Sequence, residues 1–182
     1  MKSVNYFRTF LEDKNVASLT PTSHFVVKDL CKSIDFAKDS VIVEYGPGTG
    51  VFTKFILKNT TPDSRLIAIE TNPRFVGLLE NLNDQRLTIV NDKAENIKKV
   101  LRNLGIKKID YLISGIPFSY IKDEIKSKLI KDSYDSLSEE GKFLIYQYSL
   151  HIKKYLKDYF NSINSRIQIL NFPTMFIMEA VK

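Results

Sequence analysis

The sequence is poor in cysteine, and it lacks long apolar runs and internal repeats. Cys31 is the single cysteine among the 182 residues, so the chain cannot close an internal disulfide, and this fits a reducing compartment. No run approaches the roughly 18 apolar residues of a membrane span, and residues 1–15 lack the apolar segment of a secretory signal peptide. We therefore expect a cytoplasmic protein that is soluble, or at most bound peripherally to the inner face of the membrane.

The charge balance is basic, with a net charge of +6 at pH 7. A basic surface favours nucleic acid or an anionic membrane as a partner, although a lysine-rich proteome would give the same balance. Hydrophobic residues make up 43% of the chain, which is enough for one domain with a sizeable core.

Short apolar segments alternate with helical patterns from residue 41 onward. The predicted strands span residues 41–45, 65–70, 86–91, 109–114, 142–148, 166–172 and 174–181. Helices are predicted from Asn72, around residues 97–104, from Ile121 to about residue 137, and from Leu150 to Ile163. Only Pro173 separates the last two strands, so we expect them to form an antiparallel hairpin. The alternation predicts a doubly wound α/β fold, with a mostly parallel sheet and helices on both faces.

Three glycines, Gly46, Gly48 and Gly50, follow the first predicted strand, and such a turn lets a ligand approach the backbone closely. A dinucleotide fingerprint requires G-x-G-x-x-G, but position 51 is valine. The Gly-Lys-Ser/Thr of a P-loop is also absent. We therefore favour a cofactor that joins a charged amino-acid part to a nucleoside without a pyrophosphate.

Acidic residues stand at the ends of three successive predicted strands. Glu44 precedes the glycine turn, Glu70 ends the second strand and Asp92 follows the third. A carboxylate at the second strand's tip can accept hydrogen bonds from both ribose hydroxyls, and a polar group at the third can meet an adenine amine. Glu44 and Asp92 could instead be ordinary loop and cap residues. Their positions together favour a cofactor site.

The sequence E-Y-G-P-G-T-G at 44–50 and A-I-E at 68–70 resembles the class I S-adenosylmethionine-dependent methyltransferases. The resemblance extends from about residue 40 to the closing hairpin. It implies a Rossmann-like, seven-stranded sheet, S-adenosylmethionine as cofactor, and methyl transfer without a metal site. The residues that it assigns to the cofactor are Glu44, Gly46, Gly48, Gly50, Thr53, Glu70, Thr71, Asn72, Asp92, Ala94 and Ser114.

The methyl acceptor is expected at S-G-I-P-F, residues 114–118, which end the fourth predicted strand. Pro117 lacks an N–H, so the turn can direct backbone carbonyls toward an amine. Phe118, Tyr120 and Tyr148 could surround that amine, because aromatic faces stabilise cations by ~0.5–2 kcal/mol. Ordinary core packing is the alternative for each ring.

The predicted catalytic residues are Tyr148, Gly115, Ile116 and Phe118. The hydroxyl of Tyr148 is expected to orient the amine. The two histidines, His24 and His151, stand in no motif, so the sequence identifies no general base.

Two families share the S-G-I-P-F turn. The rRNA adenine dimethyltransferases carry Asn-Leu/Ile-Pro-Tyr/Phe, but Gly115 stands here in place of that Asn, and no residues follow the hairpin to form their helical C-terminal domain. The chain is more similar to the bacterial phospholipid N-methyltransferases, which methylate phosphatidylethanolamine, although that family often has Leu in place of Phe118. The shared segments are F-x-x-F-L (7–11), Pro-Thr-Ser (21–23), E-Y-G-P-G-T-G-V-F-T (44–53), A-I-E-x-N-P-x-F (68–75), S-G-I-P-F (114–118) and Gln-Tyr (147–148).

This second resemblance implies methyl transfer to a phosphatidylethanolamine-type headgroup at an anionic membrane surface, with nucleic acid a less favoured partner and no obligate protein partner. An rRNA adenine or small-molecule N-methyltransferase, or a non-catalytic cofactor-binding protein, remains an alternative. We divide the chain into an N-terminal helical extension, residues 1–38, and a methyltransferase domain, residues 39–182.

The extension is expected to contact the membrane or to cover the site. An amphipathic helix is predicted over residues 4–12, with Phe7 and Leu11 on one face and basic residues nearby: Lys2, Arg8 and Lys14. Such a helix can lie in an anionic membrane interface. The alternative is that it packs on the domain as a simple lid.

Overall fold

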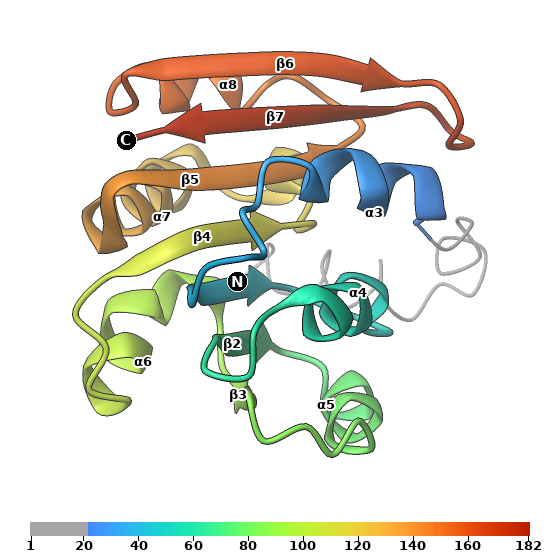
Figure 1. Ribbon diagram of the computed structural model, residues 1–182. Helices are drawn as coiled ribbons and strands as arrows, with labels where there is room; N and C mark the ends of the chain where they lie inside the picture. Colours follow the sequence, from blue (N-terminus) through green and yellow to red (C-terminus); the bar gives the residue numbers. More distant parts are fainter. Residues whose placement is uncertain (1–21) are drawn as a thin grey trace.

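The computed structural model describes residues 22–182, and the amphipathic helix predicted over residues 4–12 lies outside this range (Figure 1). Its centre is a seven-stranded sheet with the order β3-β2-β1-β4-β5-β7-β6. The strands are β1 (Val41–Tyr45), β2 (Arg65–Glu70), β3 (Leu87–Asn91), β4 (Ile109–Ser114), β5 (Leu137–Gln147), β6 (Ser162–Gln168) and β7 (Met175–Val181). Strands β1 to β5 are parallel, and β7 runs antiparallel to both β5 and β6. This confirms the predicted fold class.

The direction of the strand order changes between β1 and β4. From β1 the chain moves outward through β2 to β3, and it then crosses back to place β4 on the other side of β1. Ligands bind at the carboxyl ends of parallel strands where the order reverses in this way. Gly46 directly follows β1 and Gly115 directly follows β4, so both expected binding turns lie at this point.

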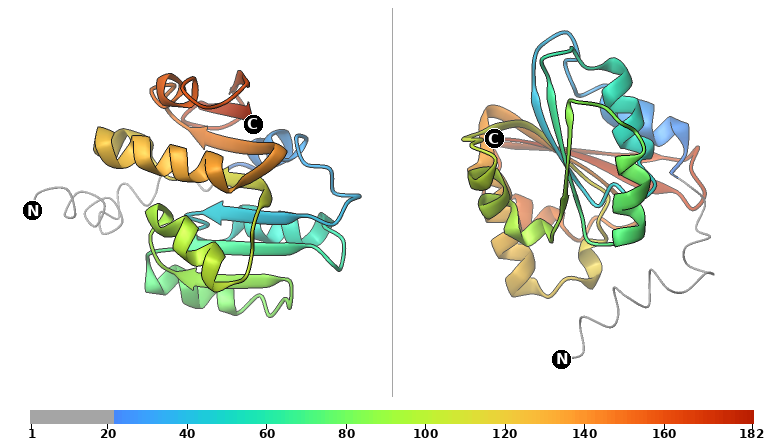
Figure 2. Two further views of the ribbon diagram at one scale, coloured as in Figure 1. Left: turned by 90° about the vertical axis from the view of Figure 1, so that its left-hand side faces the viewer. Right: turned by 90° about the horizontal axis from the view of Figure 1, so that it is seen from below.

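Helices cover both faces of the sheet (Figure 2). One face carries α3 (His24–Cys31), α4 (Val51–Asn59) and α5 (Pro73–Glu80). The other carries α6 (Ile97–Asn103), α7 (Asp123–Ser136) and α8 (Lys153–Leu156). Two 3-10 turns, η1 (Ala94–Asn96) and η2 (Phe118–Tyr120), follow β3 and β4. Within residues 22–182, no helix is long and apolar enough to cross a bilayer.

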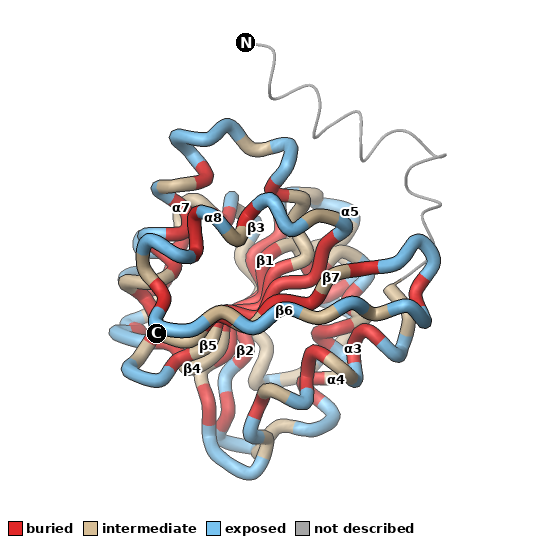
Figure 3. Tube along the Cα trace, turned by 90° about the horizontal axis from the view of Figure 1, so that it is seen from above, coloured by how far each residue is buried: buried red, intermediate tan, exposed pale blue. Residues whose placement is uncertain are grey.

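The central strands are buried on both faces, as parallel strands between two helical layers must be (Figure 3). In β1, Ile42 packs in the cluster under α3 and α4, whereas Val43 packs in the cluster under α6 and α7. This alternation explains why residues 41–43 of β1 form a continuous apolar run in the sequence.

Local caps set the starts of two helices. The Ser23 hydroxyl accepts a hydrogen bond from the Val26 N–H at 3.4 Å, which caps α3. Asn72 accepts one from the Arg74 N–H at 3.0 Å, with Pro73 as the first residue of α5. The helix start at Asn72 was predicted from the sequence.

Helix α3 belongs to the core of the sheet domain. Its buried residues Val26, Val27 and Leu30 pack in one cluster with Ile42 of β1 and Leu144 of β5. The predicted division at residue 38 therefore does not coincide with a break in packing, because residues 24–31 already cover the sheet.

The closing hairpin differs from its prediction in register. Strand β6 spans residues 162–168, not 166–172, and the preceding helix is limited to residues 153–156. Pairing of Ser162 with Val181 and of Gln168 with Met175 sets this register, so the apolar residues after Gln168 form the connection. Periodicity could not reveal this, because register depends on contacts with β7.

Candidate cofactor and acceptor site

The glycine turn at the end of β1 has a backbone that favours glycine. Gly46, Gly48 and Gly50 have φ values of +63°, +56° and +77°, in the left-handed region. The Gly46 N–H donates to the Ile69 carbonyl at 2.9 Å, and the Gly48 N–H donates to the Glu70 carboxylate at 3.1 Å. The turn is thereby held against the end of β2.

The three glycines are required for different reasons. A Cβ at Gly46 would lie 2.8 Å from Cγ2 of Ile116, and one at Gly50 would lie 2.9 Å from Cδ2 of Leu79. A Cβ at Gly48 would meet nothing within 4 Å. Gly46 and Gly50 therefore allow close packing within the protein, whereas Gly48 borders open space where a ligand can reach the backbone.

Glu70 links the turn to the segment after β2. Its side chain is buried, and it accepts hydrogen bonds from the Gly48 N–H at one oxygen and from the Asn72 N–H, at 2.8 Å, at the other. The Thr71 hydroxyl lies 3.5 Å from the second oxygen. Each carboxylate oxygen has two lone pairs, so the oxygen bonded to Gly48 could still accept one of the ribose hydroxyls expected of Glu70.

Glu44 is buried beneath the turn, and only one of its oxygens has a partner in the described part of the chain. Thr53 donates its hydroxyl to Oε2 at 2.7 Å, whereas the buried Oε1 atom makes no hydrogen bond. Burial raises the pKa of Glu44 from 4.5 to about 7; the Thr53 hydrogen bond opposes this rise and the charge of Glu70 adds to it. An ammonium group, such as that of an amino-acid cofactor, could satisfy Oε1.

Asp92 directly follows β3, and its carboxylate is bonded to nearby residues of the chain. Its Oδ1 atom accepts hydrogen bonds from the Asn96 amide at 2.6 Å and the Lys93 N–H at 2.7 Å, and these two bonds lower the pKa of Asp92. Ala94, buried, begins η1 just beyond it. The Oδ2 atom of Asp92 has no hydrogen bond among residues 22–182, so it could still accept from an adenine amine.

Ser114 and Gly115 end β4 directly beside the glycine turn. Ser114 is fully buried, and the Gly115 N–H donates to the Tyr45 carbonyl at 3.4 Å. A Cβ at Gly115 would lie 2.8 Å from Cε2 of Tyr146 and still closer to its hydroxyl oxygen. Tyr146 therefore lies directly against the turn, and position 115 can carry no side chain while that ring stays in place.

Tyr146 is a site residue that the sequence analysis missed. Its ring stacks on Phe52 of α4 at a centroid distance of 4.4 Å. Burial, followed by the charge of Glu44, raises the pKa of Tyr146, so the hydroxyl stays protonated. Tyr146 stands two residues before the predicted Tyr148, but the sequence does not show that β5 brings it against Gly115.

The other predicted acceptor residues are divided between the site and the core. Ile116, half-buried, contacts the glycine turn, and Tyr148 is exposed just beyond β5. Phe118 is fully buried, and its ring centroid lies 6.4 Å from that of Phe143 in the core under α6 and α7. The prediction that Phe118 surrounds the amine is therefore wrong. Phe118 packs in the core instead, because η2 turns its side chain inward.

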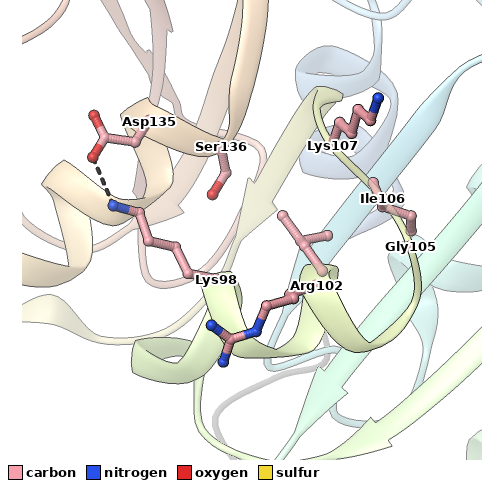
Figure 4. Close-up of a pocket in the computed structure, with 8 residues that line it drawn as sticks. Lys98, Arg102, Gly105, Ile106, Lys107, Asp135 and Ser136 are labelled. Atoms are coloured by element: carbon pink, nitrogen blue, oxygen red, sulfur yellow. Dashed lines mark hydrogen bonds and ion pairs between the residues drawn. The ribbon is translucent and has the colours of Figure 1, made fainter.

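A separate pocket of about 430 Å³ lies at the opposite edge of the sheet (Figure 4). It is lined by residues of α6 and its C-terminal loop, including Lys98, Arg102 and Lys107, and by Asp135 at the end of α7. Lys98 and Asp135 form an ion pair at 2.7 Å. None of the predicted site residues contributes to this pocket. Within the described range, no cluster of three or more His, Cys, Asp or Glu side chains could hold a metal ion.

Comparisons with known proteins point to methyltransferases. The sequence pattern of the ribosomal RNA adenine dimethylase family matches residues 10–176. Ornithine lipid N-methyltransferase of Singulisphaera acidiphila is 30% identical over 130 residues, which cover 70% of this chain and 68% of that protein. Ribosomal RNA small subunit methyltransferase A of Clostridium acetobutylicum is 26% identical over 117 residues, or 63% of this chain and 40% of that one.

A solved structure shows the same fold. N-methyltransferase NodS from Bradyrhizobium japonicum, in complex with S-adenosyl-L-homocysteine, has a TM-score of 0.75 over 100% of this chain and 99% of its own. At 12% identity, this likeness concerns the fold.

We predict that Gly48→Val abolishes S-adenosylmethionine binding in a folded protein, because the new side chain fills the open space above the turn. The left-handed backbone adds strain of about 1–2 kcal/mol. Gly105→Val is the matched control, since Gly105 has a φ of +67° and equally open surroundings at the other edge of the sheet. Calorimetry and thermal unfolding measure both effects. A folded Gly48→Val protein with unchanged affinity would contradict this assignment.

Glu44→Gln tests the buried carboxylate. Because the pKa of Glu44 is raised to about 7, the folded protein binds a proton that the unfolded chain has released, and the free energy of unfolding falls as the pH rises from about 4.5 to 7. Glutamine keeps an acceptor for Thr53 without this cost. At pH 8 the variant should be more stable by on the order of 1–3 kcal/mol, and it should bind S-adenosylmethionine more weakly.

Urea titrations at pH 5 and pH 8 measure the stability difference. Glu139→Gln, at an exposed carboxylate of β5, is the control and should leave the pH dependence as it is. Equal pH slopes for Glu44→Gln and wild type would show that Glu44 is not the titrating group.

Proposed function

The chain belongs to the ribosomal RNA adenine dimethylase family of S-adenosylmethionine-dependent methyltransferases, and within that chemistry we propose that it methylates the amine of a phospholipid headgroup of the phosphatidylethanolamine type. Family and relatives are enzymes, which removes the alternative of a non-catalytic cofactor-binding protein. The acceptor would be reached at a membrane surface.

The contact between Gly115 and Tyr146 carries the proposal. The rRNA adenine dimethyltransferases place an Asn at the position of Gly115, but a side chain here would overlap the ring and hydroxyl of Tyr146. The chain therefore presents a tyrosine hydroxyl where that family presents an amide. A hydroxyl can accept a hydrogen bond from the N–H of an aliphatic amine, and it does not require the hydrogen-bond pattern of a nucleic-acid base.

The relative from Singulisphaera acidiphila supports a lipid acceptor. Its name assigns it N-methylation of ornithine lipid, an amine carried on a lipid, and the similarity covers about two thirds of both chains. The rRNA relative is matched over less than half of its own length. These similarities therefore favour a lipid amine over rRNA as the methyl acceptor.

The site residues fit S-adenosylmethionine and suggest a role for each group. When bound, this cofactor supplies a methyl group that its sulfonium charge already activates. The Glu44 Oε1 atom would accept hydrogen bonds from the cofactor's ammonium, and Glu70 would accept one from its ribose. The open space at Gly48 would admit the part of the cofactor that joins these two groups. Held in this way, the cofactor would present its methyl group near the end of β4.

On the acceptor side, the protein mainly supplies alignment. The amine must lose a proton to water before it attacks, because an ammonium has no lone pair. The Tyr146 oxygen then accepts an N–H of the amine, which directs the lone pair toward the methyl carbon. Tyr148, exposed just beyond β5, would contact the headgroup from the solvent side.

The family and the rRNA relatives favour a second candidate, N-methylation of adenine in rRNA. Incubation with methyl-labelled S-adenosylmethionine separates the two. We expect label in phosphatidylethanolamine or ornithine lipid vesicles and none in rRNA fragments. Label in RNA adenine with none in any lipid amine would replace our proposal with the second candidate.

Tyr146→Phe should lower kcat/KM for the amine about 10- to 100-fold, since one hydrogen bond to a charged or developing cationic group contributes ~1.5–3 kcal/mol. S-adenosylmethionine affinity should stay unchanged. Tyr148→Phe, just beyond β5, is the matched control and should have a smaller effect because Tyr148 is exposed. The assignment fails if steady-state kinetics show the larger loss for Tyr148→Phe.

The amphipathic helix predicted over residues 4–12 stays a prediction. If Phe7 and Leu11 insert among lipids while the nearby basic residues face anionic headgroups, deletion of residues 1–15 should abolish lipid methylation and vesicle binding. Flotation with anionic vesicles measures this. A truncated protein that methylates lipid at the full-length rate would rule out this role.

A further inference from the structure

Apolar side chains gather at the end of β6 and in the connection to β7, which together we call the hairpin tip (residues 167–172). Ile167 and Leu170 are each 57% exposed, and Ile169 is 74% exposed. Connections of this kind usually present polar side chains to solvent, and a run of exposed apolar residues marks an interaction surface.

Polar bonds hold the hairpin tip in place. Asn171 is buried between the exposed residues; it accepts the Ser23 N–H at 3.0 Å and donates to the Pro173 carbonyl at 2.7 Å. Gln168 donates to Asp29 of α3 at 3.1 Å. The tip is thus fastened to α3, and its apolar side chains project from a fixed support.

The hairpin tip lies at the same edge of the sheet as the acceptor site. Phe176 of β7 pairs with Gln147 at the carboxyl end of β5, so the connection before β7 extends beyond that end. Figure 1 shows the tip on the side toward which β1, β4 and β5 point. Tyr148 and Leu150, both exposed, follow β5 at this corner.

The hairpin tip itself carries no charged side chain. Residues 159–178 contain no aspartate or glutamate, and their single charged side chain, Arg166, forms an ion pair with Asp29 of α3 at 3.2 Å. A carboxylate-free apolar loop can enter the headgroup region of an anionic bilayer without repulsion.

We propose that the hairpin tip inserts into the interface of an anionic lipid bilayer and thereby turns the Gly115–Tyr146 site toward the headgroups. This rests on the proposed function, because a lipid acceptor keeps its acyl chains in the bilayer while its amine is methylated. The enzyme must then approach the membrane with the carboxyl edge of its sheet, where the tip stands.

The test compares apolar-to-polar changes at two ends of the sheet. Leu170→Ser and the double variant Ile169→Ser/Leu170→Ser remove the tip's apolar surface. Leu78→Ser is the matched control, because Leu78 is 50% exposed on α5, beside the opposite edge strand β3. All three changes are at exposed positions, so thermal unfolding should stay close to that of wild type.

Flotation with phosphatidylglycerol–phosphatidylethanolamine vesicles measures docking. We expect the double variant to bind at least about tenfold more weakly and Leu78→Ser to bind like wild type. Methyl transfer to vesicle phosphatidylethanolamine should fall in parallel. Transfer to a short-chain phosphatidylethanolamine, dispersed as monomers, should stay unchanged because the site itself is intact.

Other outcomes separate the two proposals. Undiminished vesicle binding by the double variant overturns the docking surface, even if lipid is methylated. Loss of self-association on sedimentation, with vesicle binding retained, overturns it in favour of a second copy of the chain. Vesicle binding that depends on the tip, without methylation of any lipid, supports the docking surface and rejects the proposed function.

Discussion

The hydrogen bonds of Glu70 hold together the edge of the sheet on which the site depends. One carboxylate oxygen accepts the N–H of Gly48, and the other accepts the N–H of Asn72. These bonds join the turn after β1 to the segment that starts α5, while Tyr45 and Ile69 pair in the strands below. The left-handed glycines and the start of α4 are therefore positioned before any cofactor arrives, so little ordering cost remains for binding.

A second constraint, at the end of β4, bears on the acceptor. Tyr146 of β5 stacks on Phe52 of α4 and lies directly against Gly115. The positions of β5, α4 and the turn after β4 therefore depend on one another. Because the ring occupies the space of a side chain at position 115, the chain departs there from the adenine-specific pattern of the family to which it belongs. The fold is shared across methyltransferases with many acceptors, and such local packing distinguishes one acceptor from another.

The two proposals concern the same edge of the molecule. The acceptor turn, the end of β5 and the hairpin tip follow one another across β4, β5 and β7. A soluble acceptor would need no apolar surface beside the site, whereas a lipid acceptor needs the enzyme to approach the bilayer in one orientation. Asn171, through its bonds to Ser23 and Pro173, gives the tip the rigidity that such an orientation requires.

The sequence by itself determined the features that depend on neighbours along the chain. The strands at 41–45, 65–70 and 109–114, the turn of Gly46 to Gly50 and the Asn72–Pro73 helix start were predicted and confirmed, because apolar runs, backbone freedom and capping are local properties. Tertiary structure alone decided the rest. Pairing with β7 set the register of β6 and exposed the hairpin tip, packing buried Phe118 in the core, and the approach of β5 to β4 brought Tyr146 onto Gly115. These outcomes depend on which distant segments meet, and residue periodicity carries no record of that.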